Sequence, residues 1–432
     1  MKRSHFLQGL AALGPLAGVT GCLAPGVSVY PPTPTPIPPD SGGSVPPPSA
    51  PAPFRLGFER LGENGFDLLQ GQRVGLVCNQ ASVTRYGTQV RTILQRDPRV
   101  NLTALYSPEH GIDGKALAGQ YVASGRDSLT GLAVHSLYAA TRKPSSQQLS
   151  MIDVLVFDLQ DLGVRSYTYM STLFRCMEAC AEQGKTFVVL DRPNPLGGLR
   201  VEGPPLEARW TSFVGNAPVP YVHGMTSGEL AALFHGARMV NRPRLHVVPM
   251  TGWRRSQIWT DTKLRWIKTS PNIPRPISAF HYVATGMLGG ASGVDVGIGT
   301  SEPFAYAGGD GVDGRSLAYA MRARRIPGVR FSPYRSSLRE GHGGVKLDVD
   351  PKTAGDLCAL DVILIDEINR RRGGRVLADM GVSTRDLFHK VYGSDRLYND
   401  LRRGVRAEAI IAGWAAPNAS FRSLRQPYLL YS

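Results

Sequence analysis

An acidic residue that directly follows a hydrophobic run is the first candidate for chemistry. Residues 102–106 read Leu-Thr-Ala-Leu-Tyr and continue into Ser-Pro-Glu-His-Gly, so Glu109 stands at the end of an expected strand. We expect its carboxyl group to project over the edge of a sheet, with His110 beside it to orient it. The alternative is that Glu109 caps the next helix. The catalytic interpretation predicts general acid/base chemistry.

A second acidic cluster follows the hydrophobic run at 154–157. Asp158, Gln160 and Asp161 come next in the sequence. Side chains alternate along an extended segment, so Asp158 and Gln160 are expected on the same side of it. With Glu109, these two aspartates offer the pair of carboxylates that acid/base catalysis requires. A metal held by the same three carboxylates is the weaker alternative, and we predict no metal site.

Further polar and aromatic side chains follow the same runs and are predicted to bind the substrate. Arg165 and Arg192 are candidates for an anionic group, although Arg165 could instead neutralise Asp158 or Asp161. Tyr167 and Tyr169 could form a wall on which a sugar stacks, or belong to the core. The complete predicted binding set is Asn79, His110, Gln160, Arg165, Tyr167, Tyr169, Arg192, Asn194, Glu202, His223 and Asn272.

The elements that must position these residues are short β-branched runs separated by helix-length segments. Runs at 73–79, 102–106, 154–159 and 186–190 alternate with expected helices at about 88–96, 145–150 and 169–183. This alternation predicts an α/β fold with a Rossmann-like, doubly wound parallel sheet at 54–224. In such a sheet, ligands bind at the carboxyl ends of the strands. Four polar clusters therefore converge on one crevice.

The regular alternation of short strands and helices ends after residue 224. A capping box from Thr226 to Glu229 opens a helix at about 230–238, and a strand is expected at 246–250. A helix at 356–371 and a strand at 344–349 follow. We therefore predict a smaller α+β C-terminal domain at 225–432 that completes the cleft.

Several function classes are excluded by missing motifs. The loop after the first run, 79–87, has neither a G-x-G-x-x-G pattern nor a P-loop lysine, so we expect no dinucleotide cofactor and predict none of any kind. No G-x-S-x-G elbow and no H-E-x-x-H pair occurs. The net charge of +15 suits adhesion to anionic wall polymers or lipid headgroups. No nucleic-acid motif accompanies it, so no nucleic-acid partner is expected, and no oligomeric state is predicted.

The N-terminus has the pattern of an export signal. Residues 1–22 combine a basic start, an apolar stretch too short to span a bilayer, and Val-Thr-Gly-Cys, which resembles a bacterial lipobox with Cys22 as the lipidated residue. An ordinary secretory signal is the alternative. Residues 23–53 are rich in proline and are predicted to be a semi-rigid linker. We expect an exported protein, anchored to the membrane and facing the cell envelope or periplasm, with Cys78, Cys176, Cys180 and Cys358 in its core.

Taken together, the motifs resemble those of the NamZ-type exo-β-N-acetylmuramidases. The likeness covers roughly 54–432 and includes Pro-Glu-His-Gly at 108–111 and Asp-Arg-Pro-Asn-Pro at 191–195. The other matching motifs lie at 74–80, 156–169, 201–204, 223–226, 228–230 and 270–274. One position departs from the pattern: Ile298 stands where the family is expected to carry an arginine that could contact the lactyl carboxylate.

The resemblance implies a Rossmann-like domain, a smaller C-terminal domain and an active site in the cleft between them. It also implies release of N-acetylmuramic acid from the non-reducing end of peptidoglycan-derived glycans, with Glu109 as the catalytic residue. We expect Glu109 to act as general acid and Asp158 or Asp161 as its partner. The main alternative is a non-catalytic lipoprotein that binds muropeptides, which Ile298 favours. An amidase or esterase on the same polymer lacks its nucleophile and zinc motifs.

Overall fold

A predominantly parallel sheet of eight strands forms the first half of the molecule. The structure, a computed structural model, describes residues 26–29 and 53–432. The strand order is β1-β8-β7-β6-β2-β3-β5-β4, and only β4 runs antiparallel to its neighbour. The strands are β1 (Val27–Val29), β2 (Arg73–Val77), β3 (Asn101–Ser107), β4 (Gly125–Arg126), β5 (Ala133–Ser136), β6 (Val154–Phe157), β7 (Thr186–Leu190) and β8 (Arg244–Val248).

Helices cover both faces of this sheet because successive side chains in each strand point to opposite faces. Val74, Leu76 and Cys78 pack in one cluster with residues of α1 and α2, whereas Val77 packs in another cluster with α4 and α5. These helices are α1 (Gly57–Glu63), α2 (Val90–Arg96), α3 (Ser146–Leu149), α4 (Tyr169–Glu182) and α5 (Ser227–Ala237). Leaving out the edge strands β1 and β4, the order is that of a Rossmann sheet, with the switch point between β2 and β6.

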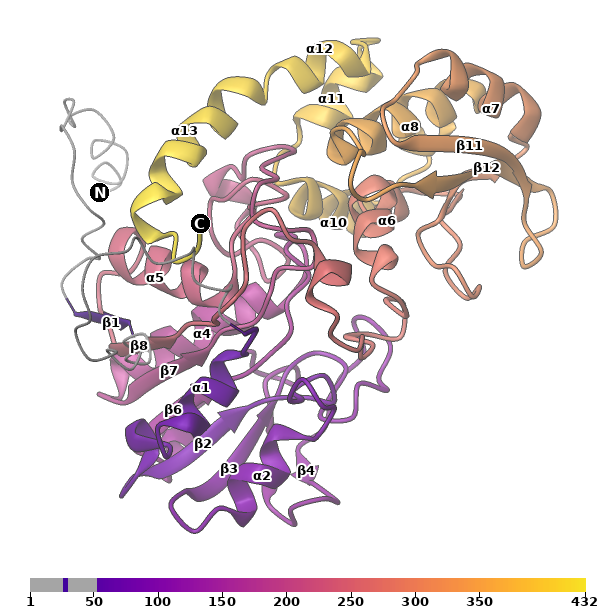
Figure 1. Cartoon of the computed structure of the whole chain (residues 1–432). Helices are drawn as coiled ribbons and strands as arrows, with labels where there is room; N and C mark the ends of the chain where they lie inside the picture. The colour runs from indigo at the N-terminus through magenta and orange to yellow at the C-terminus, as the bar shows by residue number, and fades with distance from the viewer. Residues whose placement is uncertain (1–25, 30–52) are drawn as a thin grey trace, which may run out of the picture.

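An antiparallel sheet of four strands and a group of helices form the second half (Figure 1). The strand order is β11-β12-β10-β9. The elements of the second half are α6 (Ile277–Thr285), β9 (Val294–Asp295), β10 (Tyr306–Asp310), α7 (Gly314–Ala323), β11 (Val329–Arg335), β12 (His342–Val349), α8 (Leu357–Arg371), α9 (Arg375–Ala378), α10 (Val382–Tyr392), α11 (Arg396–Arg402), α12 (Ala407–Ala412) and α13 (Ala415–Arg425). Short 3₁₀ turns lie at Asp67–Leu69, Ala208–Trp210, Trp259–Thr262, Leu288–Gly290 and Gln426–Tyr428.

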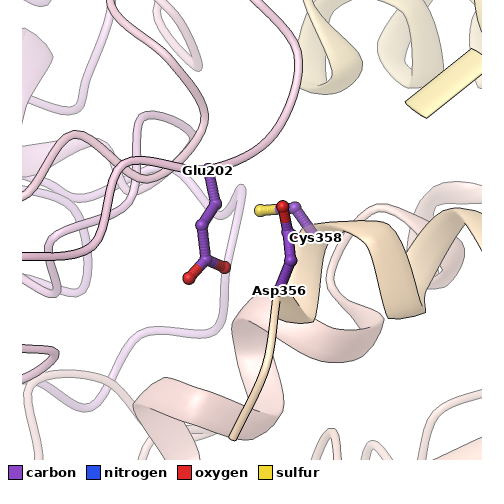
Figure 2. A group of neighbouring side chains, drawn as sticks. All are labelled: Glu202, Asp356 and Cys358. Atoms are coloured by element: carbon purple, nitrogen blue, oxygen red, sulfur yellow. The ribbon is translucent and has the colours of Figure 1, made fainter. Parts of the chain in front are cut away.

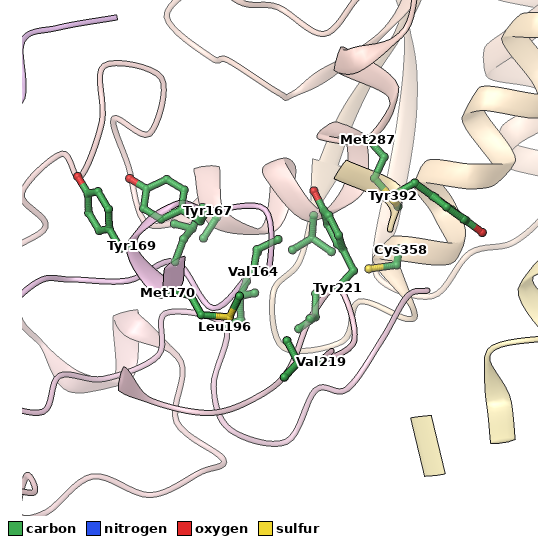
Figure 3. Packing of buried hydrophobic residues seen from close by; sticks show 14 of the residues in the cluster. Val164, Tyr167, Tyr169, Met170, Leu196, Val219, Tyr221, Met287, Cys358 and Tyr392 are labelled. Atoms are coloured by element: carbon green, nitrogen blue, oxygen red, sulfur yellow. The ribbon is translucent and has the colours of Figure 1, made fainter. Parts of the chain in front are cut away.

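One hydrophobic core runs from the first sheet into the second half. Tyr221 and Tyr169 of the first half belong to the same buried cluster as Met287, Cys358 and Tyr392 of the second (Figure 3). Burial of such side chains is the main favourable contribution to folding. Helix α13 then leads the chain back beside α5, so the last residues lie against the first sheet (Figure 1). The two halves therefore share one continuous core.

The predicted α/β fold with two domains is confirmed, and three details differ. The expected boundary at 224/225 falls inside the sheet domain, because β8 pairs with β7 and α5 packs beside α4. The predicted linker at 23–53 contains β1, which pairs with β8; Cys22 and the rest of the export signal lie outside the described residues. Strand β5 was not expected. The predicted capping box is present, since Thr226 accepts the Glu229 amide N–H and Glu229 accepts that of Thr226.

The four cysteines that follow the N-terminal segment are buried and unpaired, as predicted. Across 26–29 and 53–432, no helix has both the length and the apolar composition needed to cross a membrane.

Candidate active site

Glu109 lies at the carboxyl end of β3, where two hydrogen bonds hold its carboxylate. The N–H of Gly119 donates to Oε1 at 2.7 Å, and the hydroxyl of Thr168, directly before α4, donates to Oε2 at 2.7 Å. Gly119 belongs to the turn that follows the Pro-Glu-His-Gly motif. The side chain is 7% exposed, so the carboxylate is fixed in orientation but retains access to solvent. These contacts come from the loops around Glu109 and leave no role for it as a helix cap.

His110 shapes this turn instead of contacting the Glu109 carboxylate. Its backbone is left-handed, with φ of 72°, and its Nδ1 lies 2.7 Å from the carbonyl oxygen of Ala116. The Ala116 N–H returns a hydrogen bond to the His110 carbonyl. His110 therefore holds the loop that brings the Gly119 N–H to Glu109. The expectation that it orients Glu109 is met only through this loop.

Tyr138 is a member of the site that the sequence patterns did not identify. It follows β5, the parallel neighbour of β3, and the Leu137 N–H donates to the Ser107 carbonyl at 2.8 Å. Burial raises the pKa of Tyr138 to about 12, and the nearby charge of Glu109 and a hydrogen bond to it act in the same direction. The sequence patterns did not identify Tyr138 because the strand before it was not recognised: β5 has only four residues and includes a histidine and a serine.

Four aromatic and hydroxyl side chains continue the site from Glu109 toward the second half. Tyr167 and Tyr169 meet edge to face with ring centroids 4.8 Å apart, and both donate to Thr269, to its Oγ1 and its carbonyl oxygen respectively. Tyr282 of α6 lies 3.0 Å from the hydroxyl of Ser166 and 6.4 Å from Tyr167, ring to ring. Tyr167 and Tyr169 are thus buried in the wall of the site and offer no open face for a sugar to stack on.

Asp161 is the second carboxyl group near this wall. The Gly163 N–H donates to its Oδ2 at 2.8 Å, whereas its buried Oδ1 has no hydrogen-bond partner among the described residues. Burial raises the pKa of Asp161 to about 7. Both Asp161 and Glu109 act electrostatically on Tyr167, which lies close to the two of them. A carboxyl group with a pKa near neutrality can accept or donate a proton at physiological pH.

Asp158 occupies the switch point of the sheet and is paired there. Arg192 binds it through two hydrogen bonds, from Nε at 2.6 Å and from Nη2 at 2.9 Å, and both side chains are buried. Arg192 also donates to the Val83 carbonyl, and Ser82 donates to the Asp158 carbonyl. Asn79, buried beside them at the end of β2, donates to the Tyr169 hydroxyl. The roles predicted for Asp158 as a catalytic carboxylate and for Arg192 as an anion binder stay predictions, and the structure shows the two side chains paired with each other.

The guanidinium of Arg165 is also engaged by other parts of the chain. It is fully buried and donates to the carbonyl oxygens of Pro204 and Val219 at 2.8 Å each and of Tyr392 at 2.6 Å. Tyr392 ends α10, so this guanidinium links the two halves. Its N–H groups are taken up by backbone carbonyl oxygens, and neither Asp158 nor Asp161 is among its partners in the described part of the chain, so the predicted neutralisation of these aspartates is wrong and its buried position does not favour anion binding.

Three further predicted residues hold loops. Asn194 donates to the Met225 carbonyl at 3.0 Å and accepts from the Leu196 N–H. Gln160 donates to the Pro193 carbonyl at 2.8 Å, and its buried Oε1 lacks a partner among the described residues. His223 accepts from the Met225 N–H, and burial lowers its pKa to about 3, so the ring is neutral.

Glu202 lies apart from Glu109, in a cluster with Asp356 and Cys358 at the start of α8 (Figure 2). The potential ligand atoms lie within 4.8 Å of one another. Glu202 accepts from the Leu357 N–H at 3.1 Å and pairs with Arg200 at 2.6 Å. Burial raises its pKa to about 7. Because a cation and a helix N-terminus already satisfy this carboxylate, the cluster fits helix capping better than metal binding.

Asn272 and Ile298, the position that departs from the family pattern, lie in the loops before and after α6. Asn272 is half-buried in the loop after Thr269, and its amide group makes no hydrogen bond within the described part of the chain. Ile298 is 40% exposed between two glycines with left-handed backbone, Gly297 and Gly299. Its loop continues to Phe304, whose ring meets Tyr282 edge to face at 4.8 Å. The side chain of Ile298 is thus accessible to solvent, and that of Asn272 is partly so.

Comparison with known proteins gives consistent matches along the chain. Family models described as exo-beta-N-acetylmuramidase NamZ match residues 74–277 (N-terminal) and 280–431 (C-terminal). Peptidoglycan beta-N-acetylmuramidase NamZ of Bacillus subtilis (strain 168) is 37% identical over 369 residues, 84% of this chain and 88% of that protein. Crystal structures of two DUF1343 family proteins from Bacteroides fragilis NCTC 9343 are also similar. They have TM-scores of 0.82 and 0.64 and identities of 39% and 28%, and each comparison covers 88% of this chain and 99% of the other.

Proposed function

This chain belongs to the exo-β-N-acetylmuramidase NamZ family, and we propose that it is a glycoside hydrolase that releases N-acetylmuramic acid from the non-reducing end of peptidoglycan fragments. The observation that carries the proposal is the oriented carboxylate of Glu109 at the carboxyl end of β3, inside the Pro-Glu-His-Gly motif. Family membership favours this function over a wall-binding lipoprotein without activity.

In the proposed reaction, Glu109 is the general acid that protonates the glycosidic oxygen as the bond to the sugar breaks. Gly119 and Thr168 hold its carboxyl group at one orientation, which keeps the transferred proton in line with the leaving oxygen. Tyr138 lies against the same group and stays protonated at neutral pH, since its pKa is raised to about 12.

We assign the second carboxyl role to Asp161 and not to Asp158. Asp158 is neutralised by Arg192 in a buried bidentate pair, whereas Asp161 faces no cation and has one oxygen without a partner among the described residues. In its ionised form Asp161 serves as the base that activates water or orients the acetamido group of the substrate. Its pKa of about 7 makes this form available from neutral pH upward.

The test is turnover of a chromogenic N-acetylmuramide by the soluble body, residues 54–432, beside the N-acetylglucosamine analogue. The expected result is hydrolysis with preference for the muramide. Binding of muropeptides without any turnover would support the lipoprotein alternative, and equal turnover of both sugars would remove the substrate assignment.

We further propose that the protein is exported and carries a lipid on Cys22. The support is the order of a basic, an apolar and a lipobox-like segment at the N-terminus, followed by a proline-rich stretch. A lipid there would hold the enzyme at the membrane surface, next to the polymer on which it acts.

A further inference from the structure

Arg142 is an exposed guanidinium that lies over a pair of touching aromatic rings, Tyr138 and Phe213, whose centroids are 5.8 Å apart. Its central carbon lies 4.4 Å from the ring centroid of Tyr138 and 4.7 Å from that of Phe213. Within the part of the chain that the structure describes, no hydrogen bond or ion pair engages its N–H groups. Many other arginines of this chain pair with a carboxylate or with carbonyl oxygens, as Arg165 and Arg192 do.

The two rings fix the position of this guanidinium. The Tyr138 N–H donates to the Ser136 hydroxyl, and its carbonyl accepts the Val122 N–H at 3.0 Å. Phe213 sits in a tight turn closed by two hydrogen bonds between Ser212 and Gly215. Aromatic rings accept no conventional hydrogen bond, so the N–H groups of Arg142 keep their capacity to donate, and a guanidinium can donate to both oxygens of a carboxylate.

Tyr138 connects Arg142 to the catalytic carboxyl group. Tyr138 lies close enough to Glu109 for the Glu109 charge to raise the pKa of its hydroxyl, and its ring lies 4.4 Å from the central carbon of Arg142. Arg142 and Glu109 are therefore separated by little more than one tyrosine side chain. A sugar whose glycosidic oxygen lies at Glu109 would bring the substituents of its ring close to Arg142.

We propose that Arg142 binds the lactyl carboxylate of the terminal N-acetylmuramic acid and selects this sugar over N-acetylglucosamine. The inference rests on the proposed function. The lactyl ether carboxylate is the only charged group that distinguishes the two sugars, and Arg142 is the exposed, unpaired guanidinium beside Glu109. Arg142 would have the role that was predicted for Arg165 and Arg192, and this role does not require an arginine at position 298.

The experiment compares Arg142→Gln and Arg142→Lys with the wild-type protein on three substrates: the chromogenic N-acetylmuramide, its lactyl methyl ester and the N-acetylglucosaminide. Arg142→Gln is expected to lower kcat/KM for the muramide roughly 10- to 100-fold, mainly through KM, because a charge-assisted pair is lost. It should change kcat/KM for the ester and for the glucosaminide by less than about twofold. Lysine keeps the charge without the planar fork, so an intermediate loss is expected.

Arg402→Gln is the matched control, because Arg402 also lies over an aromatic ring, Tyr398, at 5.5 Å and is exposed. Calorimetric titration with free N-acetylmuramic acid and with its methyl ester gives a second readout that needs no turnover. Arg142→Gln should weaken the binding of N-acetylmuramic acid and leave the binding of its methyl ester unchanged. Equal losses on all ligands, or no loss on any, would overturn the role of Arg142. A wild-type protein that binds the acid but hydrolyses no muramide would instead overturn the proposed function.

Discussion

Replacing Asp161 by asparagine separates the chemical role of this residue from its cost to the fold. Asp161 is 9% exposed, and one of its oxygens lacks a hydrogen-bond partner among the described residues. Burial raises its pKa from 3.8 to about 7, a difference of about three units. Asparagine has nearly the same shape and can still accept the Gly163 N–H, but it never ionises.

The expected change in stability follows from linkage between folding and protonation. Between pH 4 and 7 the unfolded chain has lost the Asp161 proton and the folded chain keeps it, so the stability of the wild-type protein falls as the pH rises through this window. At about 1.4 kcal/mol per pKa unit, the upper limit of this loss is about 4 kcal/mol above pH 7. We therefore expect Asp161→Asn to unfold at a higher temperature than wild type at pH 8 and at the same temperature at pH 4.

The same substitution should remove activity. With Asp161 as base, kcat/KM of the wild-type protein should rise with pH through about 7, and Asp161→Asn should lose this limb together with a factor of roughly 10²–10⁴ in turnover. Asp361 is the control: its pKa is raised to about 8 by burial, but it accepts the Met287 and Leu288 N–H groups in the second half of the molecule. Asp361→Asn should alter stability and leave the limb in place. A wild-type profile without a limb near pH 7, or an Asp161→Asn protein that is equally destabilised at pH 4 and pH 8, would refute the reasoning.

Three further substitutions test the other assignments. Glu109→Gln should fold normally and lose roughly 10²–10⁴-fold in turnover, less on a substrate whose leaving group needs no protonation; equal losses on both substrates would speak against a general acid. Arg165→Met should lower the unfolding temperature because three carbonyl oxygens lose a charged donor, without a selective effect on muramide binding; a stable variant that binds muramide weakly would restore the sequence-based role. Cys22→Ala should move the full-length protein from the membrane fraction to the soluble fraction, and a variant that stays with the membrane contradicts lipidation.

The fold could be predicted from sequence because the strand signals are strong and local. Residues 73–77 and 186–190 are short apolar runs that become buried on both faces, and the helices between them have the expected lengths. Strand β5 was not predicted because it is short and partly polar. The domain boundary was predicted too early because the alternation of strands and helices in the sequence ends before β8, the last strand of the sheet. Tertiary pairing with β3 and β7 decides both features, and pairing is not encoded in local pattern.

The site could be predicted only in part. Glu109 was predicted because ligands bind at the ends of strands in a parallel sheet, and the structure places its carboxylate at the end of β3. Arg165, Arg192 and Asn194 have the same sequence signal, but their donors saturate backbone carbonyls and a buried carboxylate. A polar residue after a strand either faces the ligand or holds the loop that does. Only the positions of the neighbouring loops distinguish the two cases. Arg142 is the reverse example, because we propose that it binds the ligand although no sequence pattern singled it out.

The switch point of the sheet explains where the chemistry lies. In a Rossmann sheet the crevice opens between the strands at which the connections reverse, here β2 and β6. Asp158 and Arg192 close that position with a buried ion pair, and the loop after β2 has no glycine-rich turn to admit a phosphate. Glu109 and Tyr138 follow the next two strands on one side, β3 and β5. We therefore expect the active site at the carboxyl ends of β3 and β5, one strand away from the switch point. A sheet order typical of nucleotide binding can thus serve a glycan, because side-chain pairing at the switch point decides which part of the crevice stays open.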